Sequence, residues 1–237
     1  MDMISVCLAT YNGEKYIREQ LYSILEQLGE NDEVIISDDG STDRTLEVIA
    51  QFEDDRIIVL HHESCGKTSF IKAKNNFENA LKHAKGDYIF LADQDDIWKP
   101  EKVKVFMEYL GTYDCVESDA ELTAQTPYTV GHLEEHRGLL ANTIYLPFRG
   151  CCMAFTKDLL DLVLPIPDSV ITHDAWIGCC AVARKKYFKI KEDLISYRIH
   201  DNNVSVGKNN NTFAYKIYYR ICLLFNVIVR CWFKGKK

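Results

Sequence analysis

The sequence lacks several patterns that mark common protein classes. Its nine cysteines include no Cys-x-x-Cys spacing, which argues against a zinc ribbon. It has no Gly-x-Ser-x-Gly, which disfavours a Ser-His-Asp hydrolase. The amino-terminal stretch MDMISVCLATYNG has no basic segment before an apolar core, so we expect no signal peptide. These absences favour a protein of the reducing cytoplasm whose thiols are free and mostly buried.

Net positive charge is also missing. The 237 residues include 28 Lys and Arg against 35 Asp and Glu, a formal net charge of −7, which argues against nucleic-acid binding through bulk charge. The charge is uneven, because residues 208–237 hold seven of the basic residues and no acid. A basic end on an acidic body predicts a tail with a partner of its own. The length suits one large domain or two small ones.

Short apolar runs alternate with amphipathic stretches over the first ninety residues. The predicted elements are strand 3–9, a helix from 17, strand 34–37, helix 42–52, strand 56–60, a helix that buries 77, 80, 81 and 84, and strand 88–91. Strands that are apolar on both faces, alternating with helices, indicate an α/β fold. Its sheet is expected to be mostly parallel and flanked by helices.

The second half of the chain is less regular. Residues 112–150 show weak periodicity, and we assign no structure to them. Beyond them we expect strand 150–155, helix 173–184 and short strands at 187–190 and 194–200. The Asn- and Gly-rich segment 201–211 is predicted to be a hinge, which divides the chain into a domain, 1–206, and a tail, 207–237.

Three of the predicted strands end in polar clusters, at 10–12, 38–39 and 93–96. Asp, Asn and Gly are good turn formers, which is a sufficient explanation for one cluster but a weaker one for three. Ligands of parallel sheets bind at the carboxyl ends of the strands. The clusters therefore predict one binding site.

The cluster Asp93-Gln94-Asp95 predicts a metal and diphosphate site. A divalent cation can hold several carboxylates together, and hard oxygen ligands favour Mg²⁺ or Mn²⁺, which usually share their coordination with phosphate. An exposed acidic turn is the alternative, but the buried strand before it and Ile97-Trp98 after it argue against that. An aspartyl nucleophile for phosphoryl transfer is disfavoured, because we expect that pattern after the first strand.

Several stretches, in this order, resemble the glycosyltransferases of family 2: SVCLATYNGEKYIREQLYSILEQ, EVIISDDGSTDRT, GDYIFLADQDDIW and THDAW. The DQDDIW variant, with NFENAL before it and GCCMAF and YRIHDNN after it, is similar to bacterial rhamnosyltransferase-like members. The resemblance covers roughly residues 3–206. It implies the GT-A fold, which is Rossmann-like with a mixed, mostly parallel sheet flanked by helices. It also implies a metal-dependent, inverting glycosyltransferase that uses Mn²⁺ or Mg²⁺.

The resemblance also implies which residues bind the nucleotide sugar. Tyr11 would stack on a pyrimidine, and Asp39 would accept a hydrogen bond from its ring N–H. Asp38 matches the same turn of the family, and its alternative role is to cap the following helix. Lys74 matches an Arg that faces the phosphates in many relatives, with Lys67 as a competing candidate. The implied nucleotide-sugar-binding residues are Thr10, Tyr11, Asn12, Glu14, Asp39, Lys74, Asp93, Gln94, Arg198 and His200.

Catalysis is assigned in the same way. Asp95, with Asp93, would hold the metal, and Asp174 matches the base that takes the proton of the acceptor hydroxyl. The alternative for Asp174 is a helix N-cap or first-turn acid. The implied pocket for the donor sugar or acceptor consists of Asp96, Trp98, Gly150, Cys151 and His173.

The basic tail is aromatic and apolar, but its uninterrupted apolar run, 221–225, is far below the ~20 residues that span a bilayer. We predict an interfacial helix on the anionic inner leaflet. A helix docked on its own domain, or in a homodimer interface, is the alternative.

The combined prediction is an enzyme peripheral to the cytoplasmic membrane face. It would transfer rhamnose from a dTDP donor, or a hexose from a UDP donor, to a hydroxyl of a lipid-linked or surface polysaccharide. A non-catalytic nucleotide-sugar-binding or scaffold protein with the same fold is the alternative. The presence of both Asp95 and Asp174 argues against it.

Overall fold

The computed structural model describes residues 2–63, 66–124, 138–200 and 212–234. The strands in these residues are β1 (Ile4–Thr10), β2 (Glu33–Asp38), β3 (Ile57–His61), β4 (Tyr88–Asp93), β5 (Ile97–Trp98), β6 (Cys115–Ala124), β7 (Met153–Thr156) and β8 (Tyr187–Ile199). They form one sheet in the order β3-β2-β1-β4-β7-β6-β8-β5. Strands β1 to β4 are parallel, whereas β7 is antiparallel to β4 and β6. The predicted α/β fold with a mixed, mostly parallel sheet is confirmed.

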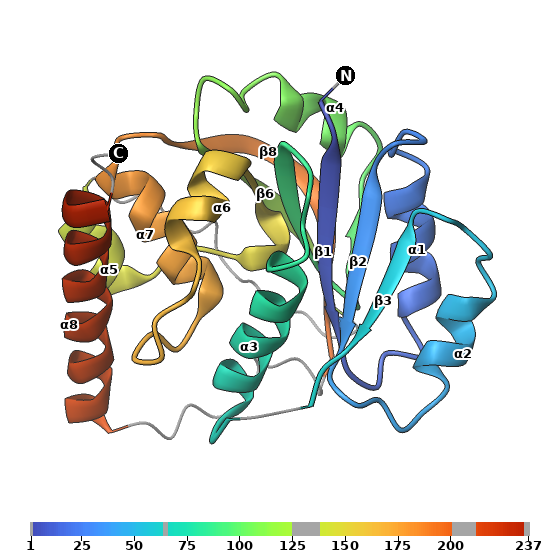
Figure 1. Cartoon of the computed structure of the whole chain (residues 1–237), viewed down its shortest axis with the longest axis horizontal. Helices are drawn as coiled ribbons and strands as arrows, with labels where there is room; N and C mark the ends of the chain where they lie inside the picture. Colours follow the sequence, from blue (N-terminus) through green and yellow to red (C-terminus); the bar gives the residue numbers. More distant parts are fainter. Residues whose placement is uncertain (1, 64–65, 125–137, 201–211, 235–237) are drawn as a thin grey trace.

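Helices cover both faces of this sheet (Figure 1). The helices are α1 (Ile17–Leu25), α2 (Thr45–Ala50), α3 (Ser69–Leu81), α4 (Lys102–Met107), α5 (Leu139–Tyr145), α6 (Lys157–Val163), α7 (His173–Ala183) and α8 (Phe213–Val229), with a 3-10 turn η1 (Gly150–Cys152) and a π-helical end η2 (Arg230–Lys234). One face packs against α1, α2 and α4, and the other against α3, α6, α7 and α8. None of the described helices is long and apolar enough to span a membrane.

The parallel strands are apolar on both faces because both faces are covered. In β4, Ile89 and Leu91 pack on the α3 side, while Phe90 and Ala92 pack on the α1 side. All four side chains are fully buried. This burial explains why the strand appears in the sequence as an unbroken apolar run rather than an alternating one.

The region that sequence reasoning left unassigned contains β6 and α5. Strand β6 is hard to recognise because polar residues lie in its buried part. Glu117 is fully buried, and its carboxylate accepts hydrogen bonds from Tyr187 Oη at 2.7 Å and from Lys189 Nζ at 3.2 Å. A buried carboxylate that is paired in this way can replace an apolar residue in the interior.

Two other sequence assignments differ from the structure, and a third is not tested by it. The expected strand 150–155 begins as the 3-10 turn η1 and becomes β7 only at Met153. The two short strands expected at 187–190 and 194–200 are one strand, β8, whose pairing with β6 contains register shifts. The expected hinge, and with it the boundary between residues 206 and 207, lies outside the described residues.

Candidate active site

The polar turns that follow β1, β2 and β4 lie at one edge of the sheet. The register pairs Thr10 with Asp38 and Ala9 with Asp93. The carboxyl ends of the three strands are therefore neighbours, and the predicted meeting of the three polar clusters is confirmed.

Gln94 connects the turn after β4 to the turn after β1. Its side-chain oxygen accepts hydrogen bonds from Thr10 Oγ1 at 2.6 Å and from the Tyr11 N–H at 2.9 Å. Its amide nitrogen donates to the Tyr11 carbonyl oxygen at 3.1 Å. A Cβ at Gly13 would lie 2.3 Å from the same side-chain oxygen, so this contact requires glycine there. Gln94, predicted to bind the nucleotide sugar, positions the turn that carries Tyr11.

We expect Gln94→Ala to lower the melting temperature by about 3 to 8 °C, because three hydrogen bonds between the two turns are lost. Nucleotide affinity should fall as well, since the backbone at Tyr11 loses its support. Differential scanning fluorimetry, with Gln51→Ala as the exposed control, measures the first effect. A melting temperature equal to that of the control would contradict this role.

The two aspartates at the end of β2 have different partners. Asp38 accepts hydrogen bonds from the N–H groups of Gly40 and Ser41, and so stabilises its own turn. Asp39 Oδ1 lies 2.7 Å from the ring nitrogen Nδ1 of His62, and the backbone N–H of His62 donates to the Asp38 carbonyl oxygen at 2.8 Å. Sequence reasoning missed His62, because it follows β3 outside every motif we recognised.

Asn12 and Glu14 hold the first turn against the second. Asn12 Oδ1 accepts a hydrogen bond from the Thr42 N–H at 2.8 Å, and Glu14 Oε2 accepts one from the Arg44 N–H at 3.0 Å. Tyr11, in contrast, is 54% exposed. Its ring is accessible to a planar group such as a nucleobase, whereas Asn12 and Glu14 stabilise the backbone beside it.

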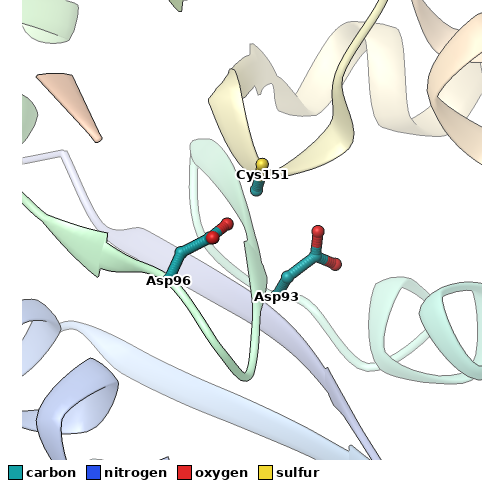
Figure 2. A group of neighbouring side chains, drawn as sticks. All are labelled: Asp93, Asp96 and Cys151. Atoms are coloured by element: carbon teal, nitrogen blue, oxygen red, sulfur yellow. The ribbon is translucent and has the colours of Figure 1, made fainter. Parts of the chain in front are cut away.

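Asp93, Asp96 and Cys151 converge where the chain reverses between β4 and β5 (Figure 2). One ligand atom from each residue lies within 4.8 Å of the others. The two aspartates meet because they stand at the two ends of a tight turn, and Cys151 approaches from η1. Asp96 Oδ2 is buried and has no hydrogen-bond partner among the described residues. The three side chains together can therefore hold a cation.

The crowding of these carboxyl groups changes their acidity. Burial, and then the charges of Asp96, Asp95 and Asp174, raise the pKa of Asp93 well above its ordinary value. Burial and the charge of Asp95 raise the pKa of Asp96 to about 8. The hydrogen bond to Cys152 and burial raise the pKa of the Cys151 thiol, so the thiol keeps its proton.

Asp95 lies outside this group. Its Oδ2 is 2.8 Å from His200 Nε2, and the His200 ring stacks on Tyr16 with the centroids 4.6 Å apart. The two predicted metal ligands, Asp93 and Asp95, are thus separated. Asp95 lies at the corner of the turn and points away from Asp93 and Asp96 at its two ends. The structure instead brings together two predicted site residues, Asp95 and His200.

Arg198, at the end of β8, holds the turn from Asp93 to Asp96 in place. We call this turn the acidic turn. Its N–H donates to Asp96 Oδ1 at 3.2 Å, and its guanidinium donates to the carbonyl oxygens of Asp95 and Asp96. It also forms an ion pair with Glu19. Arg198 was predicted to bind the nucleotide sugar, but in this structure its guanidinium bonds to the protein.

Trp98 was predicted to line a pocket, but the structure places it in the core. Its side chain is 2% exposed and packs against Phe90, with the ring centroids 5.6 Å apart. Lys102 Nζ lies 4.1 Å from the centre of the Trp98 ring and donates to the Cys151 carbonyl oxygen at 3.0 Å. Burial lowers the pKa of Lys102 to about 8. Sequence reasoning missed this buried cation, because lysine is usually a surface residue.

Gly150 lies against His173, and Asp174 follows His173 in the first turn of α7. A Cβ at Gly150 would lie 2.6 Å from His173 Nε2, so the glycine leaves room for the imidazole. That ring stacks on Phe77 with the centroids 4.0 Å apart, and burial lowers the pKa of His173. Asp174 Oδ1 accepts a hydrogen bond from the Ala175 N–H at 2.6 Å. Since its charge raises the pKa of Asp93, Asp174 shares the electrostatic environment of the acidic turn.

The sequence is similar to those of known proteins. Residues 5–120 match the profile described as Glycosyl transferase family 2. The Escherichia coli protein WfaP, a UDP-Glc:alpha-D-GlcNAc-diphosphoundecaprenol beta-1,3-glucosyltransferase, is 37% identical over 249 residues, which cover 95% of this chain and 92% of WfaP. The chain belongs to glycosyltransferase family 2. A second family member, the dTDP-rhamnosyl transferase RfbG of Shigella flexneri, is 42% identical over 220 residues, covering 85% of this chain and 74% of RfbG.

Solved structures show the same fold. TarS of S. aureus, in complex with UDP-GlcNAc, superposes with a TM-score of 0.73 at 20% identity, covering 97% of this chain and 67% of that chain. The mannosyltransferase PcManGT of Pyrobaculum calidifontis, in complex with GDP-Man and Mn²⁺, gives a TM-score of 0.61 at 22% identity, covering 96% and 64%. This glycosyltransferase therefore has the GT-A fold that the sequence resemblance implied.

The two lysines considered for the phosphates of a family 2 glycosyltransferase differ in accessibility. Lys74, in α3, is 2% exposed. Lys67, just before α3, is exposed. Lys67 is therefore accessible to a phosphate, whereas contact of a phosphate with Lys74 would need a change in the surrounding side chains.

Proposed function

We propose that this glycosyltransferase is metal-dependent and inverting. The observation that carries the proposal is the convergence of Asp93 and Asp96 at the sheet edge, where the charges of Asp95 and Asp174 also act on Asp93. Carboxylates crowded together around a buried, unpartnered oxygen are unfavourable by themselves, and a divalent cation would offset their repulsion.

The donor set fits a hard cation. Asp93 and Asp96, whose carboxylates converge, would hold Mn²⁺ or Mg²⁺ through their oxygens. Asp95 would join them as a ligand by turning from His200 toward the metal. The protonated thiol of Cys151 is a poor ligand for either ion, so we assign Cys151 to the wall of the site. Mn²⁺ in the PcManGT complex supports the choice of a divalent metal. When bound, the metal would neutralise the charge that builds on the departing nucleoside diphosphate.

The protein's own residues would bind the donor and move the proton. Tyr11 would stack on the base, and Asp39, oriented by His62, would accept from its N–H. Asp174 would remove the proton from the acceptor hydroxyl as that oxygen attacks the anomeric carbon opposite the leaving group. The neutral imidazole of His173 would separate Asp174 from the core without adding a positive charge there.

The donor and the acceptor follow from the relatives. RfbG acts with a dTDP-rhamnosyl donor, and WfaP joins glucose from UDP-Glc to a sugar on diphosphoundecaprenol. We therefore propose dTDP-rhamnose or a UDP-hexose as the donor, and a lipid-linked or surface polysaccharide intermediate as the acceptor. Such an acceptor is consistent with an enzyme that acts at the inner face of the cell membrane.

Donor hydrolysis with and without metal tests this function. We expect slow hydrolysis of dTDP-rhamnose or a UDP-hexose in Mn²⁺, its loss in EDTA and its return when Mn²⁺ is added back. Thermal shift across a panel of nucleotide sugars, with metal present, should identify the donor by the largest increase in melting temperature. Binding without hydrolysis under any of these conditions would favour the non-catalytic alternative, and full activity in EDTA would contradict the metal.

A further inference from the structure

Helix α8 and the turn after it carry an exposed apolar face. The exposed apolar side chains recur at helical spacing and form a broad stripe. They are Phe213, Ile217, Tyr218, Ile221, Phe225, Ile228, Val229, Trp232 and Phe233. None of these residues is charged, and Ile221, Phe225 and Trp232 are 61%, 64% and 70% exposed. An apolar surface of this extent is unfavourable in water and marks an interaction site.

The opposite face of α8 is fixed to the domain. Leu223 and Val227 are buried in the core cluster that also contains α7. Arg230 donates to the carbonyl oxygens of Leu162, Leu164 and Pro165 at 2.7 to 3.0 Å. The exposed stripe is therefore presented by a docked helix rather than by a detached tail.

Helix α5 adds to the same surface. Leu140, Ile144 and Tyr145 are exposed. The Arg220 guanidinium of α8 donates to the Ile144 carbonyl oxygen at 2.8 Å, which fixes the two helices beside each other. We call the exposed apolar residues of α5, α8 and the turn after α8 the α5–α8 face.

We propose that the α5–α8 face lies on an anionic lipid leaflet, with α8 parallel to the membrane plane. Charge supports this partner, because residues 208–237 contain seven Lys and Arg and no acid, and α5 contains no acid either. Aromatic side chains such as Tyr145, Tyr218 and Trp232 suit the region of the lipid headgroups. The apolar residues would enter the boundary between headgroups and acyl chains, while cations of this segment other than the docked Arg230 meet the anionic headgroups.

A second copy of this chain fits the face less well. A symmetric dimer would bring the same patch of each subunit together. The net positive charge of residues 208–237 would then be brought close to that of the partner, and no acid of this segment or of α5 could compensate for the repulsion. An anionic leaflet neutralises the same charges.

The placement agrees with a lipid-linked acceptor. The amino end of α8 lies level with the carboxyl ends of β1 to β3, where the site lies (Figure 1). A leaflet along the α5–α8 face would therefore extend to the end of the molecule at which the catalytic edge lies. This consequence rests on the proposed function, whereas the binding of lipid by itself does not.

Vesicle co-sedimentation of the full chain tests the proposal. We expect binding to vesicles of phosphatidylglycerol and phosphatidylcholine, weaker binding as salt rises, and at least about tenfold weaker binding to phosphatidylcholine alone. The double variant Ile221→Glu, Phe225→Glu should lose at least about tenfold in binding to the anionic vesicles. The matched control is Tyr22→Glu on the exposed surface of α1, which should bind as the wild type does.

Two further measurements keep the outcomes distinct. Melting temperature and donor hydrolysis should be unchanged in the double variant, so a failure of the membrane proposal is separable from a failure of the proposed function. If the variant unfolds, Trp232→Ser with Phe233→Ser near the chain end replaces it. A wild-type chain that does not co-sediment with anionic vesicles would overturn the proposal. A dimer in sedimentation velocity that the double variant breaks would assign the face to a second copy instead.

Discussion

Asp95→Asn is expected to lower sugar transfer by about 10³-fold, the upper range for losing one preorganised electrostatic contact in an active site. Asparagine keeps the size of the side chain but removes a negative ligand from the acidic turn. Affinity for the nucleotide sugar in Mn²⁺ should fall as well, because the metal and the diphosphate bind together. The fold should survive, since the charge of Asp95 contributes to the raised pKa values of Asp93 and Asp96. Initial rates and the melting temperature, both measured in Mn²⁺, check these effects.

The control for this variant is Asp161→Asn. Asp161 is an exposed carboxylate in α6, paired only with the exposed Lys157 among its described contacts. It should keep full activity and the same dependence on metal. A rate for Asp95→Asn within a few-fold of the wild type would show that the essential carboxylates are Asp93 and Asp96 alone.

Asp174→Asn is expected to lower transfer by about 10²-fold or more, the usual contribution of a general base. The shape of the side chain is kept and the proton acceptor is lost. Binding of the donor, measured by thermal shift or calorimetry, should be nearly unchanged. A fall in the rate without a fall in donor affinity is the signature of a base.

Helix α6 provides a matched control for the structural alternative. Asp158 and Asp174 are each the second residue of a helix that is preceded by threonine. Each can stabilise its helix through the dipole by about 0.3 to 1 kcal/mol. If Asp174 were only a first-turn acid, Asp158→Asn and Asp174→Asn would have equal, small effects on stability and leave transfer within a few-fold of the wild type.

The parallel half of the fold could be predicted because its signals are local. Each of β1, β2 and β4 is a short apolar run that ends in a polar turn, and the burial of both faces produces that pattern directly. The meeting of the three turns follows from the rule for the carboxyl ends of parallel strands. The position of the acidic turn in the fold therefore follows from the amino-acid sequence alone.

The second half depended on tertiary partners. Glu117 interrupts the apolar pattern of β6, and only the neighbouring strand supplies the Tyr187 and Lys189 that make its burial possible. His62 and Lys102 were missed for the same reason. Each matters through a residue far away in the sequence, Asp39 for the first and Cys151 for the second.

By itself the sequence determined the family, the place of the site and the chemistry available there, because these depend on short motifs and their order. The tertiary structure decided which groups meet: Asp93 with Asp96, Asp95 with His200, and Gly150 with His173. It also decided the orientation of the apolar, basic carboxyl-terminal helix. The sequence shows that this helix is rich in apolar residues, but only the docking of Leu223 and Val227 into the core fixes which side remains exposed. The physical reason is that burial is a property of the neighbours of a residue, and those neighbours come from distant parts of the chain.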